Sequence, residues 1–79
     1  MKVEIRFFAT CREIVGEEQK ELVVEEDMRI KDIIDLLIKE HPDLKKAKLI
    51  VSQNHKYASL NEKLKDNDEV AVFPPVSGG

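Results

Sequence analysis

Residues 30–38, IKDIIDLLI, are the stretch of the sequence that decides the fold. Apolar side chains recur there at i, i+3, i+4, i+7 and i+8, the spacing of a helix with one apolar face: Ile30, Ile33, Ile34, Leu37 and Ile38. We expect the helix to end near His41, because Pro42 disfavours helical geometry in the residue before it. Its first turn should be frayed, since Arg29 at the N-cap carries no oxygen to accept bonds from the free amides.

Two strands are expected before this helix. Residues 2–9 alternate apolar and charged side chains, which places Val3, Ile5 and Phe7 on a buried face and Phe8 on the polar side. Residues 21–25 (ELVVE) form the second strand, antiparallel to the first, with Leu22 and Val24 pointing inward. Between them we expect a short helical turn at 11–15, which Gly16 ends because it tolerates positive φ.

Three further strands are expected after the helix. Residues 49–53 form the third, and a turn at Asn54-His55 leads into a short fourth around Lys56 and Tyr57. Leu60 and Leu64 should anchor the following loop in the core. Residues 69–73 form the last strand after a turn at residues 66–68, with inward and outward side chains in alternation: Val70 and Val72 inward, Ala71 and Phe73 outward.

This order of elements predicts an α+β fold. A mostly antiparallel, mixed sheet with one main helix packed across one face is the β-grasp, or ubiquitin-like, arrangement. We expect residues 1–73 to form this domain and residues 74–79 to form an extended, flexible tail that ends in Gly-Gly. The opposite face of the sheet is then open to solvent or to a partner.

Size and charge restrict the function. The chain has 79 residues and a net charge of −3, with thirteen basic against sixteen acidic residues spread along it, so we expect neither nucleic acid nor a membrane as a partner. One cysteine cannot form an intramolecular disulfide, and no apolar run approaches 18 residues, which favours a cytoplasmic location. Because so small a domain has little room for a substrate cavity, a carrier, adaptor or subunit is favoured over a free-standing enzyme.

Side-chain chemistry offers no clear site. The sequence has no glycine-rich phosphate loop, His41 and His55 lack the spaced partners of a metal site, and Cys11 lacks a neighbouring base. We therefore expect this chain to bind no cofactor and no metal.

The C-terminal segment PPVSGG carries the strongest functional signal. Pro74 and Pro75 fix φ and lack an amide donor, so the last strand must stop and the chain should project as a stiff stalk. Gly78 and Gly79 have no Cβ, which allows the tip to pass a narrow channel. The group presented there is an α-carboxylate with a pKa of about 3.5, an unreactive anion that ATP-dependent adenylation would activate. A frayed terminus without function is the alternative.

The segments IRFFATCREIVG (5–16) and LKDNDEVAVFPPVSGG (64–79) resemble the sulfur carrier subunit of molybdopterin synthase, the MoaD family of ubiquitin-like sulfur carriers. The resemblance implies that a MoeB-like adenylyltransferase, related to the ubiquitin-activating enzyme, uses ATP to adenylate Gly79. A sulfur donor, either a sulfurtransferase or sulfide, then converts it to a thiocarboxylate. The sulfur passes to a cyclic pyranopterin inside the MoaE-like large subunit of the synthase, and this chain itself is not the catalyst.

Two alternatives stay open. Archaeal ubiquitin-like modifiers share the tail but form an isopeptide bond between it and target lysines, and sulfur carriers of other pathways also end in Gly-Gly. The sequence departs from the family pattern at Asn67, Arg29 and Gln53, where Gly, a capping Ser or Thr and an apolar residue are usual.

A partner surface is expected on the open face of the sheet. Phe8 and Phe73 both fall on it, and the first and last strands of a β-grasp sheet are neighbours, so the rings and Ala71 should form one apolar patch unless they only pack against each other or the stalk. The complete set of expected partner-binding residues is Phe8, Ala71, Phe73, Pro74, Pro75, Val76, Ser77 and Gly78.

Overall fold

The computed structural model describes residues 1–46 and 48–75. The elements follow one another as β1 (Lys2–Phe7), α1 (Ala9–Val15), β2 (Gln19–Val23), α2 (Ile30–Glu40), the 3-10 helix η1 (Pro42–Lys46), β3 (Ile50–Gln53), β4 (Lys56–Tyr57) and β5 (Asp68–Phe73). Every expected strand is present. No helix in the described part of the chain is long and apolar enough to cross a membrane.

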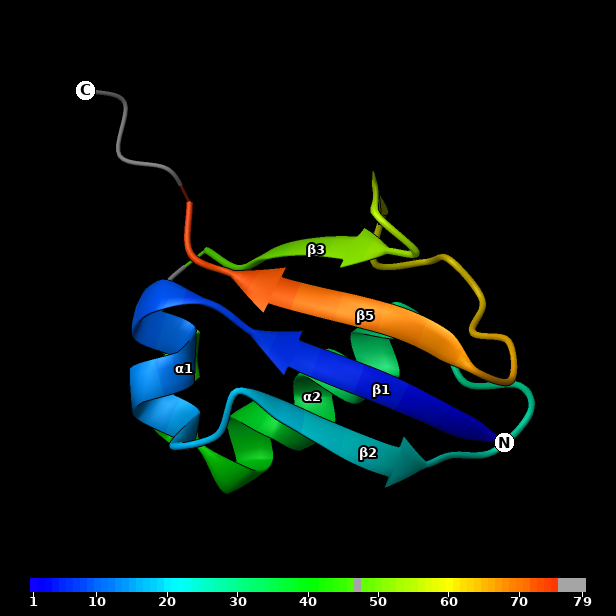
Figure 1. The fold of residues 1–79 in the computed structure, drawn as a ribbon, viewed down its shortest axis with the longest axis horizontal. Coiled ribbons are helices and arrows are strands. Elements are labelled where there is room, and N and C mark those ends of the chain that lie inside the picture. Colours follow the sequence, from blue (N-terminus) through cyan, green and yellow to red (C-terminus); the bar gives the residue numbers. More distant parts are fainter. Residues whose placement is uncertain (47, 76–79) are drawn as a thin grey trace.

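The strands form one sheet in the order β2-β1-β5-β3-β4. β1 and β5, the first and last strands of the chain, lie side by side and parallel, and the other neighbouring pairs are antiparallel (Figure 1). The register places Phe7 of β1 opposite Val72 of β5. This is the expected mixed β-grasp sheet, with β5 in its middle.

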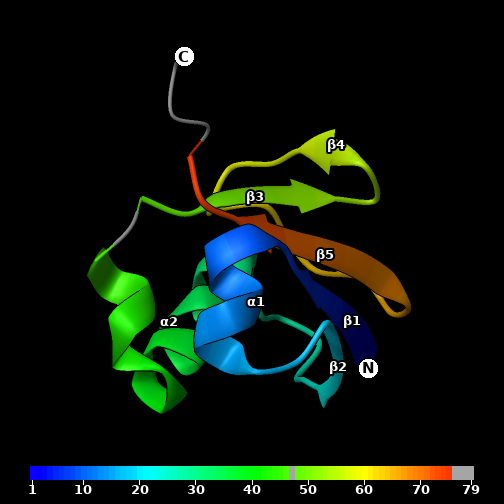
Figure 2. The same ribbon diagram turned by 60° about the vertical axis from the view of Figure 1, so that its left-hand side comes forward.

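The core lies between one face of the sheet and the two α-helices. Inward side chains of β1 and β5 are fully buried and form one core with the apolar stripe of α2 and with Cys11 and Val15 of α1. Both α-helices lie on the same side of the sheet (Figure 2). The alternation of β1 and β5 and the helical spacing of residues 30–38 are thereby confirmed. Gly16 ends α1 with φ of 84° and donates its amide to the Arg12 carbonyl, at 2.8 Å.

The expectation of a frayed first turn in α2 is wrong. The amides of Ile30 and Lys31 donate to the carbonyls of Glu62 and Leu60, at 3.0 and 2.9 Å. In addition, the Asp32 carboxylate accepts a bond from the backbone amide of Arg29, at 2.8 Å. A distant loop therefore satisfies the amides that the side chain of Arg29 cannot.

One leucine is exposed where burial was expected, and another is buried for which no role was predicted. Leu60 is 50% exposed, whereas Leu44 is fully buried at 0%. Leu44 lies in η1, a helix that the sequence did not suggest, and only Leu64 anchors the later loop as expected. β2 also begins two residues earlier than predicted, at Gln19.

Candidate functional site

The site is the base of the C-terminal segment and the open face of the sheet beside it. β5 runs between β1 and β3 and ends at Phe73, which pairs with Ile50. Pro74 and Pro75 continue the chain outside the ladder, as residues without an amide donor must (Figure 1). The expected site residues Val76, Ser77, Gly78 and Gly79 lie outside the described residues.

An aromatic patch covers the open face next to this point. The ring of Phe8, 47% exposed, stands edge-on to Phe73 with centroids 6.3 Å apart, and the ring of Tyr57 lies 6.2 Å from Phe73 on its other side. Residues that pair across neighbouring strands lie on the same face of a sheet. Ala71 pairs with Ser52 and Ser52 pairs with Tyr57, so Ala71 lies on the same face as the Tyr57 ring. The aromatic patch consists of Phe8, Ile50, Tyr57, Ala71 and Phe73.

Phe8 and Phe73 lie together as expected, and their rings contact each other. The strand register places Ala71 on the same face. Sequence reasoning missed Ile50 and Tyr57, which were assigned only to strands. Whether Ile50 and Tyr57 belong to the patch depends on the register in which β3 pairs with β4 and β5. A one-residue change in register would move these side chains to the other face of the sheet. Contiguous exposed apolar side chains of this kind are a common feature of protein contact sites.

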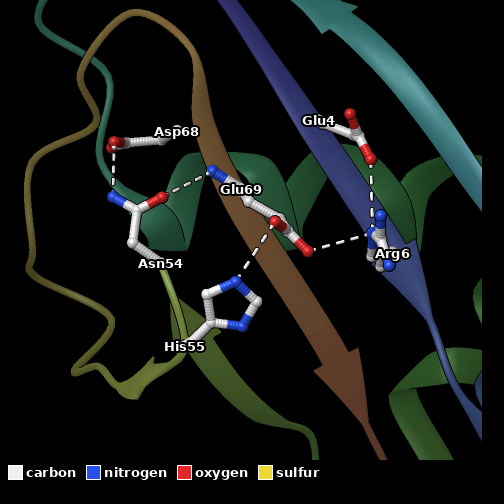
Figure 3. Close-up of polar contacts among 6 residues, drawn as sticks. All are labelled: Glu4, Arg6, Asn54, His55, Asp68 and Glu69. Atoms are coloured by element: carbon white, nitrogen blue, oxygen red, sulfur yellow. Dashed lines mark hydrogen bonds and ion pairs between the residues drawn. The ribbon is translucent and has the colours of Figure 1, made fainter.

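Charged side chains gather on the open face beside the aromatic patch, and Figure 3 shows Glu4, Arg6, His55 and Glu69 among them. The same face also carries an exposed apolar residue outside the patch, Val23, which pairs with Lys2. Glu69 lies at the centre of the charged side chains, with one carboxylate oxygen 2.9 Å from Arg6 Nε and the other 3.5 Å from His55 Nε2. Arg6 Nε is also 3.2 Å from Glu4. These side chains are partly solvated, so each pair stabilises the fold by no more than about 1 kcal/mol. Their effect is to give the open face a charged half and, nearer the C-terminal segment, an apolar half.

Asp68 is the buried carboxylate of the described chain, only 4% exposed. Burial alone would raise its pKa, but hydrogen bonds from Asn54, Gln53 and the Lys65 amide, together with the charge of Lys65, lower the pKa below the ordinary Asp value. The bonds are 2.7 to 2.9 Å long. Gln53, which departs from the family pattern, is therefore explained by a structural role, as a donor to Asp68.

Other chemically active side chains do not assemble into a reaction centre in the described residues. Cys11 is buried, which raises the pKa of its thiol and keeps it protonated at neutral pH. No group of three His, Cys, Asp or Glu side chains placed to hold a metal occurs within residues 1–46 and 48–75.

Hollows on the surface include one of about 220 Å³ beside Arg6, Phe8 and Arg12 and one of about 410 Å³ beside Asn54, Lys63 and Lys65. Neither of them is lined by a Ser, Thr or Cys nucleophile with an adjacent base. What the described residues show is an exposed apolar patch beside the base of the C-terminal segment.

Sequence comparison identifies the family of this chain. The family model described as the ThiS family matches residues 5–79. The molybdopterin synthase sulfur carrier subunit of Chlamydomonas reinhardtii is 31% identical over 100% of both chains. Small archaeal modifier protein 3 of Haloferax volcanii is 34% identical, also over 100% of both chains.

Solved structures share the fold as well. SAMP1 from Haloferax volcanii superposes with a TM-score of 0.86 at 31% identity, over 100% of both chains. A chain in a complex of subunits 1 and 2 of the molybdopterin-converting factor from Helicobacter pylori gives a TM-score of 0.69 at 30% identity, again over 100% of both chains. That homologue is therefore seen bound to a second subunit.

The mixed sheet, the single long helix across one face and the segment leaving the central strand define a β-grasp, ubiquitin-like protein. The chain belongs to the ThiS family. Full-length similarity to several molybdopterin synthase sulfur carrier subunits confirms the resemblance found in the sequence.

Proposed function

We propose that this chain is the sulfur carrier, and small subunit, of a cytoplasmic molybdopterin synthase. The observation that carries the proposal is the continuity of the central strand β5 with a segment that ends in Gly-Gly, directly beside the aromatic patch. A strand hydrogen-bonded on both sides gives the segment a fixed base, and the patch gives a partner a place to bind. Its relatives include sulfur carrier subunits of this enzyme.

The reactive group is the α-carboxylate of Gly79. In the proposed first step a carboxylate oxygen attacks the α-phosphorus of ATP, and pyrophosphate leaves, which forms an acyl-adenylate. With sulfide as the donor, hydrosulfide attacks the acyl carbon, AMP leaves and the thiocarboxylate forms directly. With a sulfurtransferase persulfide as the donor, the same attack gives an acyl disulfide; a thiol then attacks the donor's own sulfur, which releases the thiocarboxylate and leaves the donor and the thiol joined by a disulfide. The activating, MoeB-like partner binds the ATP, and this chain binds no cofactor. The thiocarboxylate sulfur finally attacks a carbon of the cyclic pyranopterin held by the MoaE-like large subunit and displaces an oxygen leaving group. Water then cleaves the C(O)–S bond of the thioester, which leaves the sulfur on the pterin and restores the Gly79 carboxylate.

The aromatic patch has a separate task in this scheme. One C-terminal segment must be delivered to two active sites, those of the adenylyltransferase and of the large subunit. Aromatic side chains dominate the buried centre of protein interfaces, and a polar rim commonly surrounds them. Here the patch would form that centre, and the charged half of the open face, around Glu69, would form part of the rim.

Intact mass spectrometry of the protein purified from its own organism tests the proposal. We expect a fraction of the chain in which one terminal oxygen is replaced by sulfur. Deletion of Gly79 should abolish adenylation and cofactor synthesis and leave the fold intact, because the last strand ends at Phe73. If the shortened chain still supports cofactor synthesis, the mechanism is wrong.

A second function is favoured by specific relatives. The similarity to small archaeal modifier proteins, including 34% identity to one of them, supports conjugation of Gly79 to target lysines, in place of sulfur transfer or beside it. Both routes begin with the same acyl-adenylate. A branched peptide that links Gly79 to a lysine, found by mass spectrometry after digestion, would identify the modifier route.

A further inference from the structure

The Asn54 side chain links the turn of the β3–β4 hairpin to the central strand β5 by hydrogen bonds. The Asn54 side-chain amide donates to Asp68 Oδ1 at 2.9 Å, and its oxygen accepts from the Glu69 backbone amide at 2.9 Å (Figure 3). The backbone amide of Asn54 donates to the Glu69 carbonyl at 2.8 Å. A carboxylate accepts and an amide N–H donates, so these partners determine the orientation of the Asn54 side chain.

The backbone at Asn54 suits only a few residue types. Asn54 and His55 have φ of 51° and 70°, the left-handed conformation of both central residues in a two-residue hairpin turn. Asn and Gly adopt this conformation at low cost, but Gly has no side chain with which to reach β5. Asn therefore fits this position in two ways: it adopts the left-handed backbone conformation of the turn, and its side chain forms hydrogen bonds with β5.

The hairpin depends on the hydrogen bonds of Asn54 for its position, because β4 is short and lies at the edge of the sheet. It has two residues, pairs only with β3, and carries Tyr57, whose side chain is 81% exposed. A ring with so little packing around it depends on its backbone for its position. The contact of Tyr57 with Phe73, at 6.2 Å, thus relies on how firmly the turn at Asn54 is held.

We propose that Asn54 is a positioning residue for the docking surface, which holds Tyr57 beside Phe73 before a partner arrives. The inference rests on the proposed function for the identity of that partner. When Asn54 is replaced by a residue that cannot reach β5, the hairpin moves more freely and binding must order it again. We expect affinity for the large subunit to fall by about 3- to 10-fold, the usual effect of ordering one or two side chains.

The test uses Asn54→Gly, which keeps the turn and removes the side-chain bonds. Asn67→Gly is the matched control, because Asn67 also has left-handed φ, 67°, and lies in a different turn, before β5. Calorimetric titration with the large subunit compares these variants with Tyr57→Ala and with Asn54→Gly/Tyr57→Ala, well below the melting temperature of each.

We expect weaker binding by Asn54→Gly, unchanged binding by Asn67→Gly, and no added loss from Asn54→Gly when Tyr57 is already Ala. Equal effects of Asn54→Gly with and without the Tyr57 ring would overturn the inference, because the residue would then act through something else. Unchanged affinity of Asn54→Gly would overturn it as well.

Nuclear Overhauser contacts between the Tyr57 and Phe73 rings give a readout that needs no partner. We expect Asn54→Gly to weaken them and Asn67→Gly to retain them. Contacts that persist in Asn54→Gly would overturn the positioning role even if Phe73→Ala weakens binding. Lost contacts together with unchanged binding by Phe73→Ala would instead contradict the docking surface of the proposed function.

Discussion

The ring of Phe8 meets the ring of Phe73 edge to face, with the ring planes inclined at 79°. Phe8 follows the last residue of β1, and its backbone amide donates to the Val72 carbonyl at 3.1 Å, which extends the parallel pairing of the two strands. The N-terminal and C-terminal strands thus bring two rings together at the point where the C-terminal segment begins. An edge-to-face pair is favourable by about 0.5–1.5 kcal/mol beyond the area that it buries.

Phe73→Ala should weaken binding to both the adenylyltransferase and the large subunit by at least about 1 kcal/mol, because it removes the ring that Phe8 and Tyr57 both contact. Isothermal titration measures the loss. Leu36→Ala is the control, since Leu36 is an exposed apolar residue on α2 and lies away from the open face. If Phe73→Ala binds both partners as tightly as the unchanged protein, the aromatic patch is not an interface.

The isolated chain should transfer no sulfur to the cyclic pyranopterin, even when chemically thiocarboxylated. Positioning of reactants can lower a barrier by about 7–11 kcal/mol, and neither hollow described above provides a nucleophile and base to hold or activate a substrate. The measurement compares product formation with and without the large subunit. Comparable rates in the two reactions would show that this chain is itself the catalyst.

Leu44→Ala should lower the free energy of unfolding by about 2–5 kcal/mol, because it empties a fully buried position. Leu60→Ala makes the same chemical change at a half-exposed position, and we expect it to cost much less. Urea denaturation followed by circular dichroism measures both. Equal losses would mean that η1 does not pack against the core as described.

Asp68→Asn should destabilise the fold by about 1–3 kcal/mol at pH 7, because one acceptor oxygen becomes an NH₂ group that faces N–H donors. The pKa of Asp68 is lower in the folded than in the unfolded chain, so its stabilising effect is complete above the ordinary value of 3.8. The effect is lost as the pH falls through the folded-state pKa. The difference between the two proteins should therefore shrink below pH 3.8.

Stability measured by denaturation from pH 7 to pH 2 tests this dependence. Asp35→Asn is the control, since Asp35 lies on the exposed side of α2, and its difference from the unchanged protein should stay small throughout. A constant difference between Asp68→Asn and the unchanged protein across that range would contradict the role given to the ionised carboxylate.

Local patterns in the sequence predicted the strands and the main helix. The helical spacing of residues 30–38 and the alternation in β1 and β5 report which side chains are buried, because each depends only on near neighbours along the chain. The same alternation placed Phe8, Ala71 and Phe73 on the open face. The last six residues led to the proposal of a C-terminal carboxylate that is activated by adenylation, without reference to the fold.

The tertiary structure alone decided the contacts and hydrogen bonds between segments that are far apart in the sequence. Tyr57 joins the aromatic patch through two strand registers, and the first turn of α2 is completed by carbonyls about thirty residues further along the chain. Leu44 is buried because η1 folds back on the core. The Leu60 side chain is half-exposed, and the Leu60 backbone carbonyl accepts a hydrogen bond from the Lys31 amide in the first turn of α2. Hydrogen bonds and packing between segments far apart in the sequence leave no periodic signal, so only the folded chain shows them.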